Sequence, residues 1–303
     1  MHVRVLLPRR RPIRDRNAAL QLVTAELKQK HASDGIGALR RFLSAARERR
    51  MDANFLEVTV GSKQLLSPGM IRLSFVGDGL SAFRSTGIGD EYLRLFFPNE
   101  ETGEVVLPII DEKGHWSYRE GKPPVRCATY TVRRFDEGKR QLDIDFVVHA
   151  GGTASEWAQQ ARPGCRMIIN RPRAIFDPPE DRRWQLLLAD ATGLPAVCRL
   201  LEEATAGVQT RVIIEVACPE DEIELPEYTG VSVTWLHGSG NGVGPSRLDE
   251  VFRMMSLPET PGYLWVAAEQ KAVRAIRKHV RQVMKMPAER YQIVAYWIDQ
   301  KKN

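Results

Sequence analysis

Short segments in which apolar and polar residues alternate one by one run through the first half of the chain. A period of two is typical of strands that bury one face, and loops rich in Gly, Asp and Pro separate these segments. Because no long helical pattern lies between them, the segments predict a small antiparallel β-barrel. The predicted strands are residues 55–60, 71–76, 92–97, 128–133 and 142–148.

The rhythm changes after Arg183, where apolar strand-like segments alternate with helical patterns. Such alternation predicts an open parallel sheet with helices on both faces, as in nucleotide-binding domains. Strands are predicted at residues 184–189, 212–217, 231–236, 263–267 and 291–297, and helices at 194–204, 247–255 and 271–285. The boundary falls near residue 182, so we expect a barrel domain over 53–182 and an α/β domain over 183–303.

Residues 1–52 differ from both parts. Residues 18–50 show a helical period that predicts a pair of helices, and residues 1–50 carry 13 Lys and Arg against 4 Asp and Glu. The basic arm, which includes Arg9 to Arg16, is most simply a solvated tail. Two alternatives stay open: an organelle transit segment, and an arm that binds anions or nucleic acid.

Composition narrows the class of protein. Of the 303 residues, 43% are apolar, yet no apolar run approaches the 18 residues of a membrane span, which predicts a soluble protein with no membrane insertion. Outside the arm, 31 basic residues face 34 acidic ones, so the body gives no support for nucleic-acid binding. The four cysteines form no Cys-x-x-Cys pair, which favours a reducing cytoplasm and predicts no metal site.

One candidate segment is the predicted strand at residues 128–133. Alternation places Tyr130 on one face, and Thr129, Thr131 and Arg133 on the other. An aromatic ring can lie against a flat cofactor, a hydroxyl can reach a ring heteroatom, and an arginine can pair with phosphate. An ordinary barrel strand with a half-buried tyrosine explains the same residues.

A second candidate is the turn after the strand at residues 142–148. The chain reaches His149, turns through Gly151 and Gly152, and starts a helix at Thr153 or Ser155. Free N–H groups at the start of a helix bind anions, and glycine lets a phosphate approach the backbone. The alternative is a capped helix whose Trp157 anchors the core.

Two strands of the predicted parallel sheet end on polar residues. Asp190 and Thr192 follow the first of them, and Glu269 ends the fourth. In open α/β folds ligands bind at this edge, although Asp, Thr and Glu also serve as helix caps. A barrel that precedes such a sheet commonly holds a flavin that faces a nicotinamide.

Taken in order, these segments resemble the siderophore-interacting protein family, the FAD-binding ferric-siderophore reductases of the ferredoxin-reductase superfamily. The similarity covers about residues 53–297. The motifs that carry it are Leu66-Ser-Pro-Gly-Met70-Ile-Arg72, Thr129-Tyr130-Thr131-Val132-Arg133, Asp145-Phe-Val-Val-His149, Ala154-Ser155-x-Trp157-Ala158, Asp190-x-Thr192-x-Leu194-Pro195-Ala196, Trp265-Val-Ala-x-Glu269 and Tyr296-Trp297.

The resemblance implies that FAD is the cofactor and that NAD(P)H or ferredoxin reduces it, while a ferric siderophore is the substrate. It implies that Tyr130 and Thr131 contact the flavin and that the turn from Gly152 to Ser155, with His149 nearby, receives the pyrophosphate. The predicted cofactor-binding residues are Thr129, Tyr130, Thr131, Arg133, His149, Gly152, Thr153, Ala154, Ser155 and Trp157. The predicted catalytic residues, on the side from which hydride or substrate approaches, are Asp190, Thr192, Glu269 and Trp297.

The chain also departs from the family pattern. Ala128 stands where the family usually has an arginine two residues before the tyrosine, and Thr153 replaces a common proline. The loop after the barrel reads Asn170-Arg-Pro-Arg-Ala174 in place of Gly-Pro-x-Gly. We therefore expect Arg126, Arg171 or Arg173 to supply the missing charge. The alternative is a non-catalytic family member that binds a ligand or partner without flavin.

Overall fold

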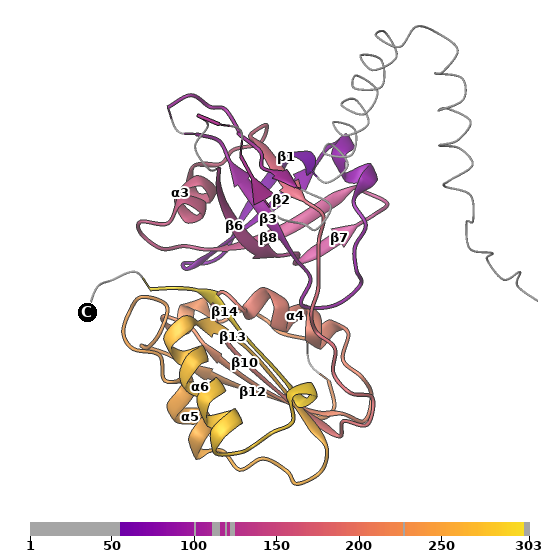
Figure 1. Cartoon of the computed structure of the whole chain (residues 1–303), viewed down its shortest axis with the longest axis vertical. Coiled ribbons are helices and arrows are strands. Elements are labelled where there is room, and N and C mark those ends of the chain that lie inside the picture. The colour runs from indigo at the N-terminus through magenta and orange to yellow at the C-terminus, as the bar shows by residue number, and fades with distance from the viewer. Residues whose placement is uncertain are drawn as a thin grey trace, which may run out of the picture. The chain divides into compact units, whose positions relative to one another are not determined.

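The barrel domain is one antiparallel sheet in the order β6-β3-β9-β1-β2-β8-β7 (Figure 1). The structure is a computed structural model that describes residues 55–99, 101–110, 116–118, 120–121, 125–226 and 228–299. The predicted arm and helix pair in residues 1–52 lie outside these ranges. The strands are β1 (Phe55–Ser67), β2 (Met70–Val76), β3 (Tyr92–Phe97), β6 (Arg126–Thr131), β7 (Arg134–Asp136), β8 (Gln141–Val147) and β9 (Arg166–Asn170).

The two ends of this sheet meet just beyond β6. The backbone N–H of Arg133 donates to the Asp143 carbonyl of β8, with N and O 2.9 Å apart. Closure in this way leaves few unpaired edge groups, which is the advantage of a barrel. The interior is filled by alternate residues of the strands, among them Val58, Leu73, Phe75, Leu95 and Ile144.

Shorter elements complete this domain. A helix, α3 (Thr153–Gln160), packs against β2 and β8, and a two-stranded ribbon is formed by β4 (Ile109–Ile110) and β5 (Trp116–Ser117). A 3-10 helix, η1 (Asp78–Ala82), contacts β1. The alternating pattern predicted five of the seven strands; it ended the first at residue 60, whereas β1 continues to the turn at Pro68.

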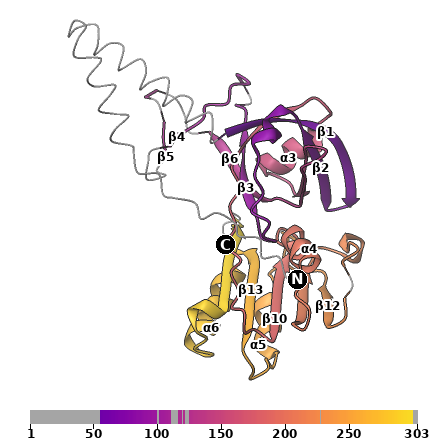
Figure 2. The same cartoon turned by 90° about the vertical axis from the view of Figure 1, so that its right-hand side faces the viewer.

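The second sheet is entirely parallel, in the order β12-β11-β10-β13-β14 (Figure 2). Its strands are β10 (Trp184–Asp190), β11 (Gln209–Glu215), β12 (Val231–Leu236), β13 (Gly262–Glu269) and β14 (Tyr291–Trp297). Its helices are α4 (Leu194–Glu202), α5 (Leu248–Met254) and α6 (Gln270–Gln282), with the 3-10 turns η2 (Pro219–Asp221) and η3 (Ala288–Arg290). A barrel followed by a parallel α/β sheet is the fold that the sequence predicted.

Helices cover both faces of this sheet, which explains why its central strands are continuous apolar runs. Leu187 and Ala189 face the core under α4, whereas Leu186 and Leu188 face the core under α5 and α6. The predicted helix over 271–285 ends earlier, at Gln282, and Lys285 takes a φ of 51° that no helix continues. Among the described helices, none is both long and apolar enough to cross a bilayer.

Candidate functional site

The four predicted catalytic residues meet at the carboxyl edge of the parallel sheet. Asp190 ends β10 and Glu269 ends β13, which are neighbouring strands whose connections leave in opposite directions. This is the switch point at which open α/β sheets bind ligands. Trp297, the last residue of β14, donates from Nε1 to Asp190 Oδ2 at 2.7 Å, and the Glu269 N–H donates to the same oxygen at 2.9 Å.

The other carboxylate oxygen of Asp190 serves Thr192. The Thr192 N–H and hydroxyl both donate to Oδ1, at 2.8 and 2.6 Å. Asp190 thus accepts four hydrogen bonds while it is 1% exposed, and burial raises the pKa of its carboxyl. Because these four hydrogen bonds use the acceptor sites of its carboxylate, Asp190 holds neighbouring groups in place and does not itself bind a ligand.

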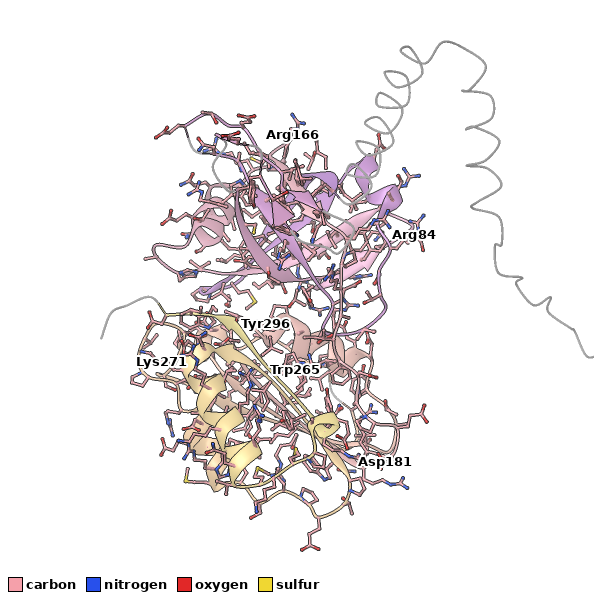
Figure 3. The ribbon with its side chains drawn as sticks, in the orientation of Figure 1. Arg84, Arg166, Asp181, Trp265, Lys271 and Tyr296 are labelled. Atoms are coloured by element: carbon pink, nitrogen blue, oxygen red, sulfur yellow. The ribbon has the colours of Figure 1, made fainter. Side chains whose placement is uncertain are left out.

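Glu269 has a similar structural duty. Its carboxylate accepts from the Lys271 N–H and so caps α6, and its second oxygen accepts from the Asp299 N–H at 3.3 Å. The residue before Trp297 on β14 is Tyr296, which Figure 3 marks together with Trp265, a ring 6.4 Å away in an edge-to-face contact. Burial raises the pKa of the Tyr296 phenol, and the nearby Thr131 hydroxyl opposes that rise.

Thr131 brings the predicted flavin strand to this edge. Its hydroxyl is buried and makes no hydrogen bond of good geometry to a described residue. Tyr130, one residue earlier, packs against Phe146 with ring centroids 4.5 Å apart, and burial raises the pKa of its phenol. Thr129, on the face of the strand opposite Tyr130, is exposed. The strand thus presents the buried Thr131 hydroxyl near Tyr296 on one face and the half-buried Tyr130 ring on the other.

Arg133 is paired within the protein. Its guanidinium makes two hydrogen bonds to Glu202 at the end of α4, at 2.6 and 3.1 Å, and its buried Nε has no described hydrogen-bond partner. A phosphate could engage the guanidinium only by competing with Glu202. The predicted phosphate contact of Arg133 therefore gains no support from the geometry.

The turn before α3 is closed by one serine. Ser155 Oγ accepts from the His149 N–H at 2.9 Å and donates to the His149 carbonyl at 2.8 Å. Gly152 lies under the His149 ring, so closely that a Cβ there would be 2.1 Å from Cε1. The helix begins at Thr153 and runs on through buried Ala154, so its first N–H groups face the turn as predicted.

Arg126 approaches this turn from the start of β6. Its Nη1 lies 3.5 Å from the hydroxyl of Thr153. It is one of the three arginines expected to replace the missing charge at Ala128, and the structure places it at the start of α3. Arg173, by contrast, bridges Tyr92 through its backbone.

Trp157 belongs to the barrel core. Its ring stacks on Phe75 at 6.3 Å with an interplanar angle of 8°, and its edge-to-face contact with Phe97 is at 5.9 Å. These contacts anchor α3 to the barrel core, as in the structural alternative that the sequence left open for Trp157. They thereby hold in place the turn that precedes α3.

Two further contacts between the domains involve residues that had not been singled out from the sequence. Arg199 of α4 is 8% exposed and pairs with Glu91, which precedes β3, at 3.0 Å. Asp221 of η2 accepts from the Ser67 hydroxyl at 2.9 Å and from the Gly69 N–H at 2.7 Å, in the β1–β2 turn. An arginine amid the apolar residues of α4 was a signal for such a contact, but its partner was not readable.

A glycine-rich loop at residues 238–244 was also missed. It follows β12, and Ser239 and the Arg247 N–H both donate to one oxygen of fully buried Glu215, each at 2.7 Å. Asn241 of this loop accepts from the Ala191 N–H at 3.1 Å. Four glycines at alternate positions were the available signal for a loop that adjoins the edge.

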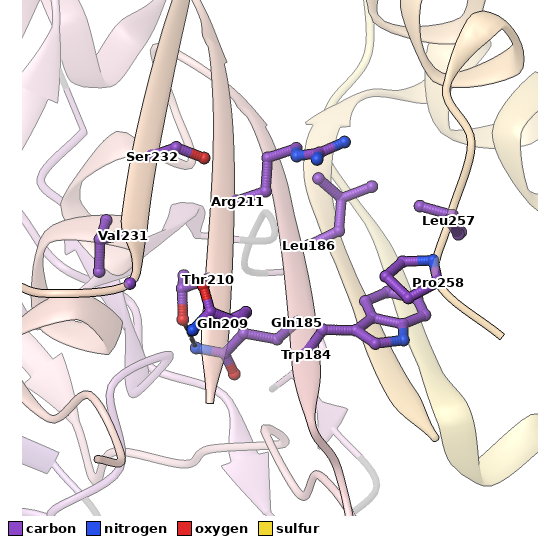
Figure 4. A pocket seen from close by; sticks show the side chains of 11 residues that line it. Trp184, Gln185, Leu186, Gln209, Thr210, Arg211, Val231, Ser232, Leu257 and Pro258 are labelled. Carbon is purple, nitrogen blue, oxygen red and sulfur yellow. Dashed lines mark hydrogen bonds between the residues drawn. The ribbon is translucent and has the colours of Figure 1, made fainter. Parts of the chain in front are cut away.

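Of two cavities in the described part of the chain, the larger is remote from this edge. It measures about 220 Å³ at the amino ends of β10, β11 and β12 (Figure 4). Its lining includes Trp184, Leu186, Arg211, Ser232, Leu257 and Pro258. The smaller cavity, about 40 Å³, lies between Gly69, Met70 and Val148 of the barrel and Ala191 and Asn241 of the α/β domain. Its position at the carboxyl ends of the strands makes it the relevant one.

Comparisons with known proteins agree with this arrangement. Residues 59–176 match the model of the siderophore-interacting FAD-binding domain, and residues 182–300 match that of the siderophore-interacting protein. The chain is 31% identical to an NADPH-dependent ferric-chelate reductase of Escherichia coli, over 82% of this chain and 94% of that protein. It is 29% identical to a ferric vibriobactin reductase of Vibrio cholerae, over 78% and 86%. The crystal structure of a siderophore utilization protein from T. fusca superposes with a TM-score of 0.71 at 31% identity, over 82% of this chain and 94% of that one.

Proposed function

Because this chain belongs to the siderophore-interacting protein family, we propose that it is an FAD-dependent ferric-siderophore reductase. It would release iron by reducing Fe(III) to Fe(II), since Fe(II) binds hard oxygen ligands less tightly. The name of the relative from Escherichia coli supports NADPH as the electron donor. Ferredoxin as an alternative donor rests on the family resemblance alone.

The residues of the barrel fit FAD. Thr131 offers a buried hydroxyl with no hydrogen bond of good geometry to a described residue, and Tyr130 offers a ring on the opposite face of the same strand. The His149 ring lies over Gly152 at the start of α3, and Arg126 stands beside Thr153 at that turn. Hydroxyl, aromatic ring, helix start and guanidinium are the groups that a ring system and a diphosphate need. This fit is the observation that carries the cofactor assignment.

The two domains have separate tasks in the proposed reaction. When bound, FAD supplies the ability to take two electrons from a nicotinamide and pass them on singly, which side chains lack. Thr131 and Tyr130 would hold the ring, and the turn from His149 to Ser155 would hold the diphosphate. Asp190 would keep Thr192, Trp297 and the start of α6 in place at the edge where the donor or the ferric chelate arrives.

We propose residues 53–182 as the FAD-binding domain and 183–303 as the NADPH-binding domain. The gap between the two matched regions, 177–181, lies beside this boundary. A cytoplasmic location is also proposed. All four cysteines are free, although Cys127 is exposed, which is ordinary in a reducing compartment.

One experiment tests the function. Purified protein is mixed with FAD, freed of excess cofactor, and its visible spectrum is recorded before and after anaerobic addition of NADPH. We expect flavin bands that bleach with NADPH and return when a ferric siderophore is added, together with one Fe(II) per electron transferred, trapped by a ferrous chelator. A protein that retains no FAD would refute the proposal and favour the non-catalytic family member.

A further inference from the structure

Arg199 is a buried cation in an otherwise apolar helix. Its side chain is 9% exposed, and its neighbours Cys198, Leu200 and Leu201 all lie in the core under α4. A charge in such a place is costly unless it is paired and hydrogen-bonded. Apart from Glu203, which follows α4 and whose Oε1 lies 3.5 Å from Arg199 Nη2, its partners belong to the barrel domain.

Those partners surround one peptide of the flavin strand. Arg199 Nη1 donates to Glu91 Oε2 at 3.0 Å and to the Val132 carbonyl at 2.7 Å. The Val132 N–H donates to the Glu91 carbonyl at 2.8 Å. Val132 is thus held through its N–H and its carbonyl, and it directly follows Thr131.

Glu91 is itself rigidly placed. It is fully buried, and its carboxylate also accepts from the Ser85 hydroxyl at 2.8 Å and from the Thr86 N–H. Two donors besides Arg199 therefore hold the Glu91 carboxylate in place, so the guanidinium binds an anion whose position is already fixed. The planar guanidinium fork suits such simultaneous contacts to a carboxylate and a carbonyl better than an ammonium does.

The segment that bears Glu91 also lies directly on α4. A Cβ on Gly89 would be 2.9 Å from Leu200 N and 3.0 Å from its Cα, closer than real side chains approach a helix backbone. Asp90 accepts from the Phe176 N–H of the linker at 3.0 Å and from Gln292 of β14 at 2.9 Å. Three consecutive residues therefore bracket the barrel to the α/β domain; we call residues 89–91 the bracket.

The amino-terminal end of α4 adjoins the carboxyl edge of the parallel sheet, where Asp190 and Thr192 lie. The helix starts at Leu194, two residues after Thr192, and Gly193 packs so tightly that a Cβ would lie 2.7 Å from the Ala267 carbonyl. A single rigid helix thus runs from the edge at Asp190 to the peptide beside Thr131. The contacts of Arg199 with Glu91 and Val132 therefore join the helix that starts at this edge to the peptide that follows Thr131.

We propose that Arg199, seated on the bracket, is the positioning residue that sets the distance between the flavin strand and the edge where the nicotinamide binds. This inference rests on the proposed function. Hydride transfer from NADPH to flavin requires near-contact geometry, so a displacement of even 1 Å is costly. Transfer of single electrons from reduced flavin to a ferric chelate does not require the close atomic contact that hydride transfer requires, wherever the chelate binds.

The experiment separates the two half-reactions of the holoenzyme. The double variant Arg199→Met/Glu91→Gln removes both charges, so neither is left buried alone, and Gly89→Ala wedges the bracket from α4 while both charges stay. Arg290→Met is the matched control, because it removes an arginine that makes two 2.7 Å contacts with exposed Asp181. FAD content, flavin reduction by NADPH in stopped flow, and ferric-chelate reduction by dithionite-reduced enzyme are measured for each.

We expect NADPH to reduce the flavin about 10- to 100-fold more slowly in both test variants. The KM for NADPH, the FAD content and the dithionite-driven iron reduction should stay within about twofold, and the control should match the wild type. Hydrogen exchange of flavin-free protein gives a readout independent of activity, with faster exchange expected at Val132 in the double variant. Unchanged NADPH kinetics in both variants, or equal slowing of both half-reactions, would overturn the proposal.

Failure of the proposed function has a different signature. If the wild-type protein binds no FAD, or if NADPH does not reduce its bound FAD, the proposed function is refuted before any variant is compared. An unchanged hydrogen-exchange rate at Val132 in the double variant by itself overturns the proposed hold of Arg199 on the bracket. Faster exchange together with normal hydride transfer shows a structural contact only, and it too overturns the positioning role.

Discussion

Replacing Arg126 by alanine is expected to weaken FAD binding while leaving the fold intact. Arg126 is exposed at the start of β6, and its Nη1 lies 3.5 Å from the Thr153 hydroxyl, where α3 begins. A diphosphate at that helix start would lie within reach of the guanidinium. Since Ala128 cannot supply the charge, Arg126 is the arginine that the structure offers in its place.

The magnitude follows from the charges and their exposure. Two unit charges 4 Å apart interact with about 1 kcal/mol in water and about 4 kcal/mol near a protein surface. Solvent around Arg126 places the expected loss at about 1–3 kcal/mol, which corresponds to about a 5- to 150-fold rise in the FAD Kd. The loss should shrink as salt is added, because exposed charges are screened.

The assay is a fluorescence titration of flavin-free protein with FAD at low and high salt. Arg134→Ala is the matched control, because it removes an equally exposed arginine from β7 of the same domain. In Arg126→Ala/Ala128→Arg the charge returns two residues along the same face of the strand, and part of the affinity should return with it. Equal FAD affinity in wild type and Arg126→Ala, or equal losses in Arg126→Ala and the control, would refute the reasoning.

Three further outcomes are expected. Trp157→Phe should lower Tm by about 2–8 °C and retain FAD, because the indole packs on barrel rings; weaker FAD binding at unchanged Tm would contradict this. Burial holds the pKa of Asp190 above its ordinary 3.8, so its contribution is fully present below that value and is lost as pH rises. The Tm of the wild type, relative to that of Asp190→Asn, should therefore rise as pH falls from about 7 to about 3.5. A difference in Tm that stays constant over this range would contradict the argument. Burial raises the pKa of Cys198 to about 11, so at about pH 8 iodoacetamide should modify exposed Cys127 well before it; peptide mapping that finds equal labelling would count against a buried thiol.

The local period of apolar residues predicted the fold, because the burial of strand and helix faces determines which positions of the sequence are apolar. Strands of the parallel sheet are buried on both faces, so β10 and β13 stand out as apolar runs between polar loops. The pattern missed β9 and β7, and it stopped β1 at residue 60. β7 has only three residues, and the outer part of β1 is exposed, so neither leaves a strong apolar signature.

The candidate site was predicted in part. Asp190, Thr192, Glu269 and Trp297 do meet, because the carboxyl ends of parallel strands share one edge. Their mutual hydrogen bonds, which leave Asp190 no free lone pair, depend on side-chain geometry between strands that lie 107 residues apart in the chain. The engagement of Arg133 with Glu202 likewise joins two domains, and no spacing rule foretells it.

The sequence alone determined the order of barrel and parallel sheet, the glycine turn that precedes a helix, and the strand ends that carry polar groups. These are local properties, since each depends on the period of apolar residues or on the chemistry of a short turn. Only the tertiary structure decided that Arg199 grips the bracket and that Arg126 stands beside α3. Buried ion pairs form between residues distant in sequence, and their energy depends on burial and on distances of a few ångström that no linear pattern encodes.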